Sequence, residues 1–276
     1  MTETFLEELN NAVSIVQRLP RVRFDIEVGP DAETWLRRKH AAGAVHEPAT
    51  LAAFFAISKC YDSRNIFDLG ALYGYFTLFA LQTFSDEAKV TAFEMHPGCI
   101  GPLVQNVGPW AKCVHGVVSD VSSPQKRIWI SGFNIYEEPE GGWTQLESIP
   151  GAMKQRGENN RGRGYAQVDF ITLDSYCAEN AAPDLIKIDV EAYQAKAILG
   201  GMETIRAHKP AIIVELHDAD KVARMGTTNA QTVQPLFDLN YKAFWCSNFR
   251  DKDARFEPVT QMRDEHERLS LMVFVP

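Results

Sequence analysis

The segment 65–77 limits the possible folds of this chain more than any other part of the sequence. It starts as an apolar strand, reaches Asp68, and turns at Gly70 and Gly74 before the apolar pattern of a helix begins. Glycine lets the backbone come close to a ligand, and the first turn of a helix offers N–H groups without intrahelical partners. A strand, a glycine turn and a helix N-terminus in this order predict a binding site for a nucleotide-like ligand.

Strand and helix patterns alternate from residue 65 onward, which is typical of a doubly wound, Rossmann-like α/β fold with a mostly parallel sheet. Nearly continuous apolar runs predict buried parallel strands at 65–69, 89–94, 112–119, 183–189 and 210–216. Helices are expected at 74–84, 97–107, 191–200 and 233–239. Strand patterns at 241–247 and 269–275 have no helix pattern between them, which indicates an antiparallel pair at one edge.

Two other parts of the chain do not follow this alternation. Residues 1–60 carry helix patterns at 2–19, 30–43 and 51–57 and a weak strand pattern at 22–28, and we expect them to form a helical cap. Residues 61–276 form the main domain in this prediction, in one compact unit with the cap. Within it, residues 131–166 are rich in glycine and charge and read as an irregular insertion or lid, which includes Trp143 and an arginine-rich part at 154–163.

Composition excludes several classes of function. The net charge of −8 argues against broad nucleic-acid binding, and no apolar run is long enough to span a membrane. No secretory signal pattern follows Met1, and the five cysteines are scattered without a CxxC pair. These features predict a cytoplasmic protein with reduced thiols and no zinc site. They leave the oligomeric state open, with a homodimer as one option.

The glycine turn favours S-adenosylmethionine (SAM) over a dinucleotide. The dinucleotide fingerprint G-x-G-x-x-G needs a glycine where Leu72 stands, so close approach of a pyrophosphate is not provided for. Asp68 would repel a pyrophosphate but attract an ammonium or a sulfonium group. SAM carries both groups and no phosphate.

Acidic residues follow the next two strands as well. Glu94, with Met95 beside it, ends the second strand, where a carboxylate can accept hydrogen bonds from both ribose hydroxyls. Ser119 and Asp120 follow the third strand, where a carboxylate can accept the adenine amino group. A turn cap is the alternative interpretation of Asp120.

The strands at 183–189 and 210–216 end in the most specific group of polar residues. Asp189 and Glu191 follow the first, and His217 follows the second as a candidate general base with Glu191. A plain pair between Lys187 and a carboxylate, a glutamate at a helix N-terminus and a structural histidine are the alternatives. In a further variant Asp189, Glu191, Glu215 and His217 hold Mg²⁺ or Ca²⁺, although we expect no metal.

These residues resemble the FkbM-type SAM-dependent methyltransferases over about residues 45–276. The resemblance rests on four pieces in order, Phe67-Asp68-Leu69-Gly70-Ala71-Leu72-Tyr73-Gly74-Tyr75-Phe76-Thr77, Ile171-Thr172-Leu173-Asp174, Asp184-Leu185-Ile186-Lys187-Ile188-Asp189-Val190-Glu191 and the run from Lys209-Pro210 to Glu215. It implies a seven-stranded class I fold and methyl transfer to a hydroxyl of a sugar, glycan or natural product. A small-molecule or carbohydrate acceptor is therefore expected.

The resemblance also implies roles for single residues. Asp68, Gly70, Ala71 and Gly74 would hold the methionine part of SAM, Glu94 the ribose and Asp120 the adenine, with Asp189 facing the sulfonium. Glu47 falls where similar sequences carry an acidic residue before the first strand, which adds it to the candidates for cofactor contact.

The chain departs from the family at three positions, where the family usually has asparagine for Leu72, glycine for Ala192 and an acidic residue for Gln194. A nicotinamide-dependent oxidoreductase and a SAM-binding protein without catalysis remain alternatives.

Overall fold

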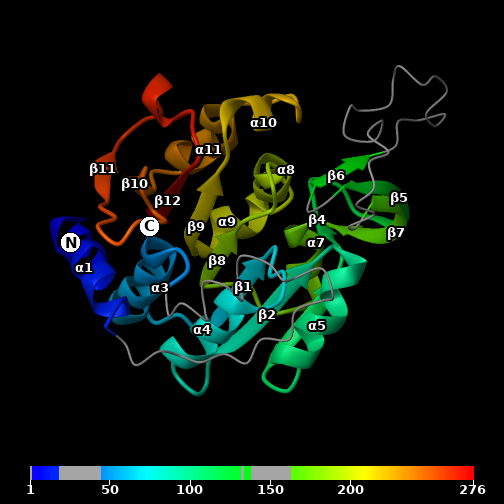
Figure 1. Ribbon diagram of the computed structural model, residues 1–276, viewed down its shortest axis with the longest axis horizontal. Coiled ribbons are helices and arrows are strands. Elements are labelled where there is room, and N and C mark those ends of the chain that lie inside the picture. Colours follow the sequence, from blue (N-terminus) through cyan, green and yellow to red (C-terminus); the bar gives the residue numbers. More distant parts are fainter. Residues whose placement is uncertain (1, 19–44, 132–133, 138–162) are drawn as a thin grey trace.

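The computed structural model describes residues 2–18, 45–131, 134–137 and 163–276 of the chain (Figure 1). Its main sheet has the strand order β11-β10-β12-β9-β8-β1-β2-β3. The parallel strands are β1 (Asn65–Leu69), β2 (Lys89–Glu94), β3 (Ala111–His115), β8 (Leu185–Ile188) and β9 (Ala211–Leu216). At the edge, β12 (Ser270–Val275) runs antiparallel to both β9 and β10 (Lys242–Cys246), as predicted. The short strand β11 (Glu257–Val259) adds an eighth strand to the seven expected.

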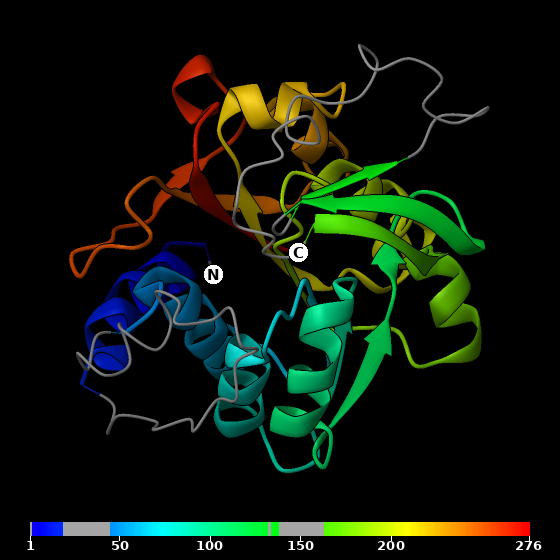
Figure 2. The ribbon, with the colours of Figure 1, turned by 45° about the vertical axis from the view of Figure 1, so that its right-hand side comes forward.

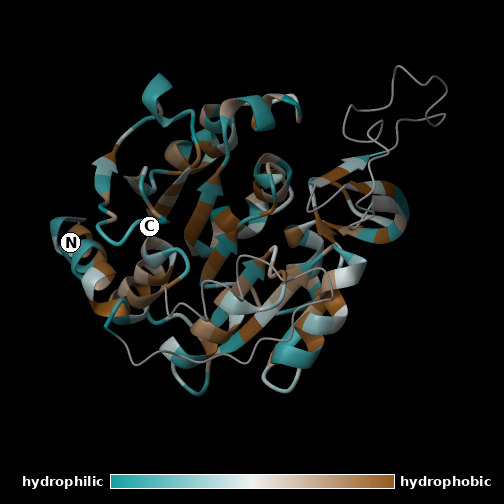
Figure 3. Cartoon of the chain, viewed as in Figure 1, coloured by the Kyte–Doolittle hydropathy of each residue, from teal (hydrophilic) through white to brown (hydrophobic). Residues whose placement is uncertain are grey.

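Helices cover both faces of this sheet, which confirms the doubly wound α/β class. One face packs against α1 (Thr2–Val16), α3 (Pro48–Cys60), α4 (Tyr75–Thr83) and α5 (Pro97–Val107). The other face packs against α7 (Leu173–Glu179), α8 (Gln194–Leu199), α9 (Met202–His208) and α11 (Asn229–Asp238). Figure 3 shows the apolar central strands between these layers. The short helices α10 (Ala219–Ala223) and η1 (Asp264–His266) lie outside them.

A second, four-stranded sheet lies beside the β3 edge of the main sheet (Figure 2). It has the order β4-β7-β5-β6, with β4 (Val117–Val118), β5 (Ser123–Ser131), β6 (Asn134–Glu137) and β7 (Arg163–Ile171). The strand predicted at 112–119 is therefore divided between two sheets at Gly116. The two ends of the segment 131–166, predicted as irregular, are strands. The rest of it, with Trp143 and most of the arginine-rich part, lies outside the described residues.

Most element boundaries fall near the predicted ones, and α5 begins at Pro97 and ends at Val107 as expected. The helix expected at 191–200 starts only at Gln194, because Glu191 and Ala192 have φ angles of 54° and 75°. The patterns at 22–28 and 30–43 lie outside the described residues. Among the described helices, none has the length and apolar character that crossing a bilayer requires.

Candidate cofactor-binding and catalytic site

A cavity of about 430 Å³ lies at the carboxyl ends of the parallel strands, where open α/β sheets bind their ligands. Its wall comes from the ends of β1, β2 and β8, from the small sheet and from the start of α3. The residues that line this cavity include Glu47, Gly70, Ala71, Leu72, Glu94, Met95, Gly116, Val117, Val118, Ile135, Asp189, Glu191, Tyr193, Glu215 and Arg250.

The turn after β1 can be made only with glycine at position 70. Gly70 has a φ of +81°, and a Cβ atom there would lie 1.8 Å from the backbone oxygen of Asp189. The N–H groups of Gly70 and Ala71 both donate to the carbonyl of Phe93, at 3.0 Å. The turn is thus wedged between the ends of β2 and β8, and it forms one wall of the cavity. Gly74 has a φ of +91° and begins α4 behind this wall.

Glu94 is the buried carboxylate of the cavity wall. Its Oε2 accepts the N–H of Leu72 at 2.7 Å and its Oε1 accepts the N–H of His96 at 2.7 Å. Burial raises the pKa of Glu94 to about 7, although these two hydrogen bonds oppose the shift. The carboxylate is held in one orientation and retains lone pairs for hydroxyl donors.

Asp68 lies beneath the turn and does not line the cavity. It is buried, its Oδ2 accepts the hydroxyl of Thr77 at 2.7 Å, and its Oδ1 lies 3.3 Å from Nζ of Lys187. Burial alone would lower the pKa of Lys187, but Asp68 and then Asp189 outweigh it and raise that pKa. Asp68 therefore joins β1 to β8 and α4, and its contact with the cofactor's cationic groups stays a prediction.

The opposite end of the cavity is mainly apolar and comes from Met95, Gly116, Val117 and Val118. Ser119 and Asp120, predicted to meet an adenine, lie just past it and outside the wall. The hydroxyl of Ser119 donates to Oδ1 of Asp120 at 3.0 Å, and the N–H of Ser119 donates to the carbonyl of Ile171. Asp120 itself is exposed.

The end of the cavity beyond Gly70 is acidic, because the strand register brings carboxylates together. Ile188 pairs with Val214, so Asp189 and Glu215 follow neighbouring strands side by side. Arg250 bridges Glu215 and Glu47, with its Nη2 3.0 Å from Oε1 of Glu215 and its Nε 3.1 Å from Oε1 of Glu47. Burial raises the pKa of both glutamates, and the charge of Asp189 adds to the shift.

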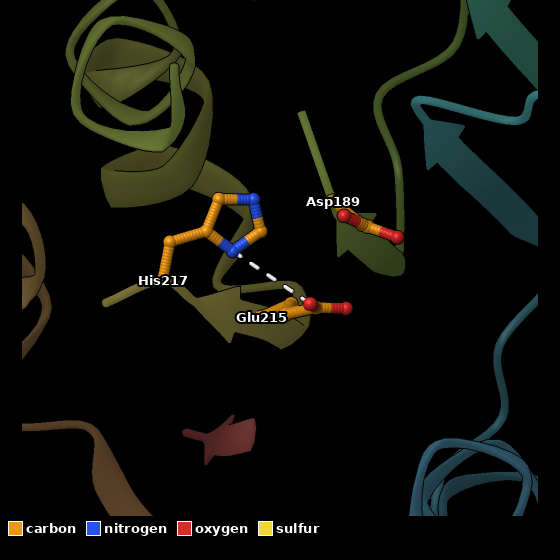
Figure 4. A group of neighbouring side chains, drawn as sticks. All are labelled: Asp189, Glu215 and His217. Atoms are coloured by element: carbon orange, nitrogen blue, oxygen red, sulfur yellow. Dashed lines mark ion pairs between the residues drawn. The ribbon is translucent and has the colours of Figure 1, made fainter. Parts of the chain in front are cut away.

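His217 lies behind this end of the cavity, next to Glu191 as predicted. Its Nε2 is 3.4 Å from Oε2 of Glu191, and its Nδ1 is 3.6 Å from Oε1 of Glu215 (Figure 4). Lys221 also pairs with Glu191. Burial alone would raise the pKa of Glu191, but His217 and Lys221 together lower it to about 2. Of the two predicted catalytic residues, Glu191 lines the cavity and His217 supports it.

Sequence reasoning missed Arg250, Tyr193 and Ile135 as parts of the wall. Arg250 lies on the connection between β10 and β11, so no nearby motif indicates its place beside residues 47 and 215. Tyr193 follows the two left-handed residues before α8, and Ile135 comes from β6. Glu47 was singled out, and it lies at the start of α3 with its Oε2 accepting the hydroxyl of Thr50 at 3.1 Å.

The wall therefore has an apolar end, a central carboxylate and an acidic end, in that order along the strand ends. Such a cavity can hold an aromatic base, then a hydroxylated sugar at Glu94, then a group with positive charge. This order of chemistry matches a nucleoside that carries an ammonium or a sulfonium.

Comparison with known proteins was made against families, curated proteins and solved structures. A family model described as a methyltransferase FkbM domain matches residues 68–243. None of the curated proteins matches the sequence.

Three solved structures are among those similar to the chain. A methyltransferase FkbM from Methylobacillus flagellatus KT has a TM-score of 0.45 and 13% identity, covering 83% of this chain, which spans 54% of that protein's length. An O-methyltransferase from Bacillus cereus in complex with SAH has a TM-score of 0.46 and 14% identity, with 100% of both chains covered. The O-methyltransferase TomG from Streptomyces achromogenes, in complex with SAM, has a TM-score of 0.44 and 7% identity, with 98% of both chains covered.

Proposed function

Because the chain belongs to the FkbM family of methyltransferases, we propose that it transfers the methyl group of SAM to a hydroxyl oxygen of a small molecule or carbohydrate. The observation that carries the proposal is the order of chemistry along the cavity, from apolar, through Glu94, to acidic. SAM has the matching order of adenine, ribose and a sulfonium with an ammonium nearby.

In this proposal the cofactor lies across the strand ends. Gly116, Val117 and Val118 contact the adenine, Glu94 accepts the ribose hydroxyls, and the turn at Gly70 and Ala71 contacts the methionine part. Asp189 and Glu47 face the positive charges. Asp68 and Gly74 contribute by holding the turn in place.

The chemistry is a direct displacement. The acceptor oxygen forms a bond to the methyl carbon, the carbon–sulfur bond breaks, and its electron pair returns to sulfur, which becomes neutral. The hydroxyl proton leaves to a base, for which Glu191 is the candidate in the cavity wall, with His217 positioning it. Alignment of the two reactants supplies most of the rate, about 7–11 kcal/mol of the barrier in well-oriented reactions.

Calorimetric titration with SAM tests the cofactor assignment. We expect a single site with SAM, none with NADH, and an affinity at least roughly tenfold weaker for Glu94→Gln, which loses a charged acceptor in a buried position. Glu203→Gln, which changes an exposed glutamate on α9, is the matched control and should bind as the natural chain does. A folded protein that does not bind SAM would refute the proposal.

A second experiment addresses the acceptor atom. Purified protein is incubated with SAM and pools of hydroxyl, amine or thiol compounds, and formation of the demethylated cofactor is measured. The proposal predicts turnover with hydroxyl compounds, and Glu191→Gln should lower turnover more than it lowers SAM affinity. Turnover confined to amines or thiols would contradict the O-methylation part alone.

A further inference from the structure

Three side chains at the ends of β8 and β9 lie close together. Methyl transfer that depends only on the alignment of donor and acceptor does not need this arrangement. One ligand atom from each of Asp189, Glu215 and His217 lies within 4.8 Å of the others. Figure 4 shows the three side chains pointing toward one another, Asp189 from the end of β8 and the other two from β9 and the residue after it. The two-residue spacing puts Glu215 and His217 on the same face of the sheet.

His217 is the independent sign that this group binds something. It is 4% exposed, and its ring nitrogens, 3.4 Å from Glu191 and 3.6 Å from Glu215, form no hydrogen bond with the described residues. Its backbone is fixed, because the carbonyl of His217 accepts the side-chain amide of Asn229 at 2.7 Å. A buried polar ring without hydrogen bonds is unfavourable unless a ligand satisfies it. The ring therefore has a free coordination position beside two carboxylates.

The charges around the group leave negative charge in excess. Its carboxylates and their neighbours are Glu47, Asp68, Asp189, Glu191 and Glu215. The cations that contact them in the described part of the chain are Lys187, Lys221 and Arg250. If all five carboxylates are ionised and His46 and His217 are neutral, five carboxylates against three cations leave two negative charges; burial, which raises the pKa of Glu47 and Glu215, works against this excess until a cation binds. SAM has a net charge of one positive and compensates only half of this excess.

We propose that Asp189, Glu215 and His217 bind a divalent cation of the Mn²⁺ class, and that this cation receives the acceptor hydroxyl. Only the role of this cation depends on the proposed function, because the cation can bind to the three side chains without SAM. The imidazole favours a transition-metal ion over Mg²⁺ or Ca²⁺, which prefer oxygen ligands alone, and the two carboxylates suit Mn²⁺ among the transition metals. A cation here would lower the pKa of an acceptor hydroxyl, so that its proton leaves more readily to the base, and would fix the orientation of the acceptor.

Arg250 is the competitor of the cation. It lies 3.0 Å from the oxygen of Glu215 that also faces Nδ1 of His217, and its side chain is 45% exposed. A cation that binds Glu215 and His217 must displace this guanidinium, which has room to move into solvent. Removal of the arginine and removal of the histidine should therefore change cation affinity in opposite directions.

The test is a titration of the full chain with Mn²⁺, after removal of metals with a chelator, in which unbound Mn²⁺ is followed by electron paramagnetic resonance. We expect one site, weakened at least roughly tenfold in His217→Gln and His217→Ala and strengthened in Arg250→Gln. His208→Ala, at the exposed end of α9, is the matched control and should bind Mn²⁺ as the natural chain does.

Circular dichroism and SAM titration of the same samples separate the outcomes. Absence of bound Mn²⁺ at concentrations up to about 1 mM in the folded natural chain overturns the inference, and so does equal affinity in the His217 variants. If a His217 variant does not fold, the direction of change in Arg250→Gln decides. Loss of Mn²⁺ binding together with intact SAM binding would refute this site and leave the proposed function standing, and the reverse result would refute the function alone.

Discussion

At the scale of single residues, the backbone next to the cavity is strained at two consecutive positions. Glu191 and Ala192 are both in the left-handed region, with φ of 54° and 75°. Glycine, which the resemblance in sequence leads us to expect at the second position, adopts this conformation without steric cost. Alanine there keeps a strain of about 1–2 kcal/mol, offset in part by its lower entropy in the unfolded chain.

Ala192→Gly should therefore raise the free energy of unfolding by up to about 1 kcal/mol, measured by urea denaturation. Ala197→Gly, in helical conformation within α8, is the matched control and should lower it by about 1 kcal/mol or more. If both variants lose stability to the same extent, Ala192 is not strained.

Glu94 gives the site a dependence on pH. Its pKa is raised to about 7 by burial, so the carboxylate becomes charged only as the pH rises through neutrality. The charged form is the stronger acceptor for ribose hydroxyls. SAM affinity should therefore increase about tenfold between roughly pH 5.5 and pH 7, a range in which the cofactor's ammonium stays protonated. Calorimetry at several pH values measures the SAM affinity, and Glu94→Gln should remove its dependence on pH. An equal change of affinity with pH in that variant would assign the titration to another group.

At the scale of elements, one carboxylate forms part of the junction between the small sheet and the main domain. Glu137 on β6 accepts hydrogen bonds from Tyr193 and Lys196, which flank the start of α8, and from Lys126 on β5 at 2.5 Å. Burial alone would raise the pKa of Glu137, but these three donors lower it to about 2. The position of the small sheet matters because Val117, Val118 and Ile135 belong to the cavity wall.

Glu137→Gln should loosen this junction without unfolding the main sheet. We expect SAM affinity to fall severalfold and amide hydrogen exchange to increase in β5, β6 and β7. The reason is that the variant weakens hydrogen bonds to a charged group, which contribute at most about 1.5–3 kcal/mol each and less where solvent reaches them. Hydrogen exchange with mass-spectrometric detection locates the change. Glu203→Gln serves as the control, and exchange that increases evenly over the whole chain would show a general loss of stability instead.

Elements with one strong pattern were predictable, and those that depend on distant contacts were not. The strands β1, β2 and β9 have continuous apolar runs, and Pro97 marks the start of α5. The pairing of the strands into a small sheet was missed for two reasons. These strands are short or charged on one face, and the chain passes from one sheet to the other at Gly116, within a single apolar run. A Cβ atom at Gly116 would lie 2.9 Å from the backbone oxygen of Asp169 on β7, a constraint that no local pattern reveals.

At the scale of the whole molecule, the cavity lies where separate structural units meet. Its wall joins α3, the ends of β1, β2 and β8, and the small sheet. A ligand that contacts all of them binds only the folded chain, so binding and global stability are coupled.

SAM at about 100 times its dissociation constant should stabilise the fold by about 2.7 kcal/mol. For a chain of this size the midpoint of thermal unfolding should rise by roughly 5–10 °C. Differential scanning calorimetry measures the shift, with NADH at the same concentration as the control. A shift with NADH and none with SAM would favour the oxidoreductase reading of the sheet.

The global architecture was within reach of sequence reasoning, whereas the composition of the site was only partly so. The glycine turn, Glu94 and Asp189 could be placed because parallel strands end at a common edge. Asp68 was placed on the right strand, but its pairing with Lys187 of the neighbouring strand was not predicted, because no local pattern shows which side chains of two strands lie beside each other. Arg250 could not be found, because its position follows from the return of the chain through β10.

The small sheet also has a bearing on how chains of this kind diversify. Its first strand, β4, and its last strand, β7, pair in parallel, with Val117 beside Phe170 and Val118 beside Ile171. The chain thus enters and leaves this sheet at neighbouring points, so that the segment between them can be replaced as one unit. A chimaera that replaces residues 117–171 with the corresponding part of a relative would keep the strand ends that carry Gly70, Glu94 and Asp189. Such an exchange would alter the apolar end of the cavity, at Val117 and Val118, and would leave the residues of its central and acidic ends in place.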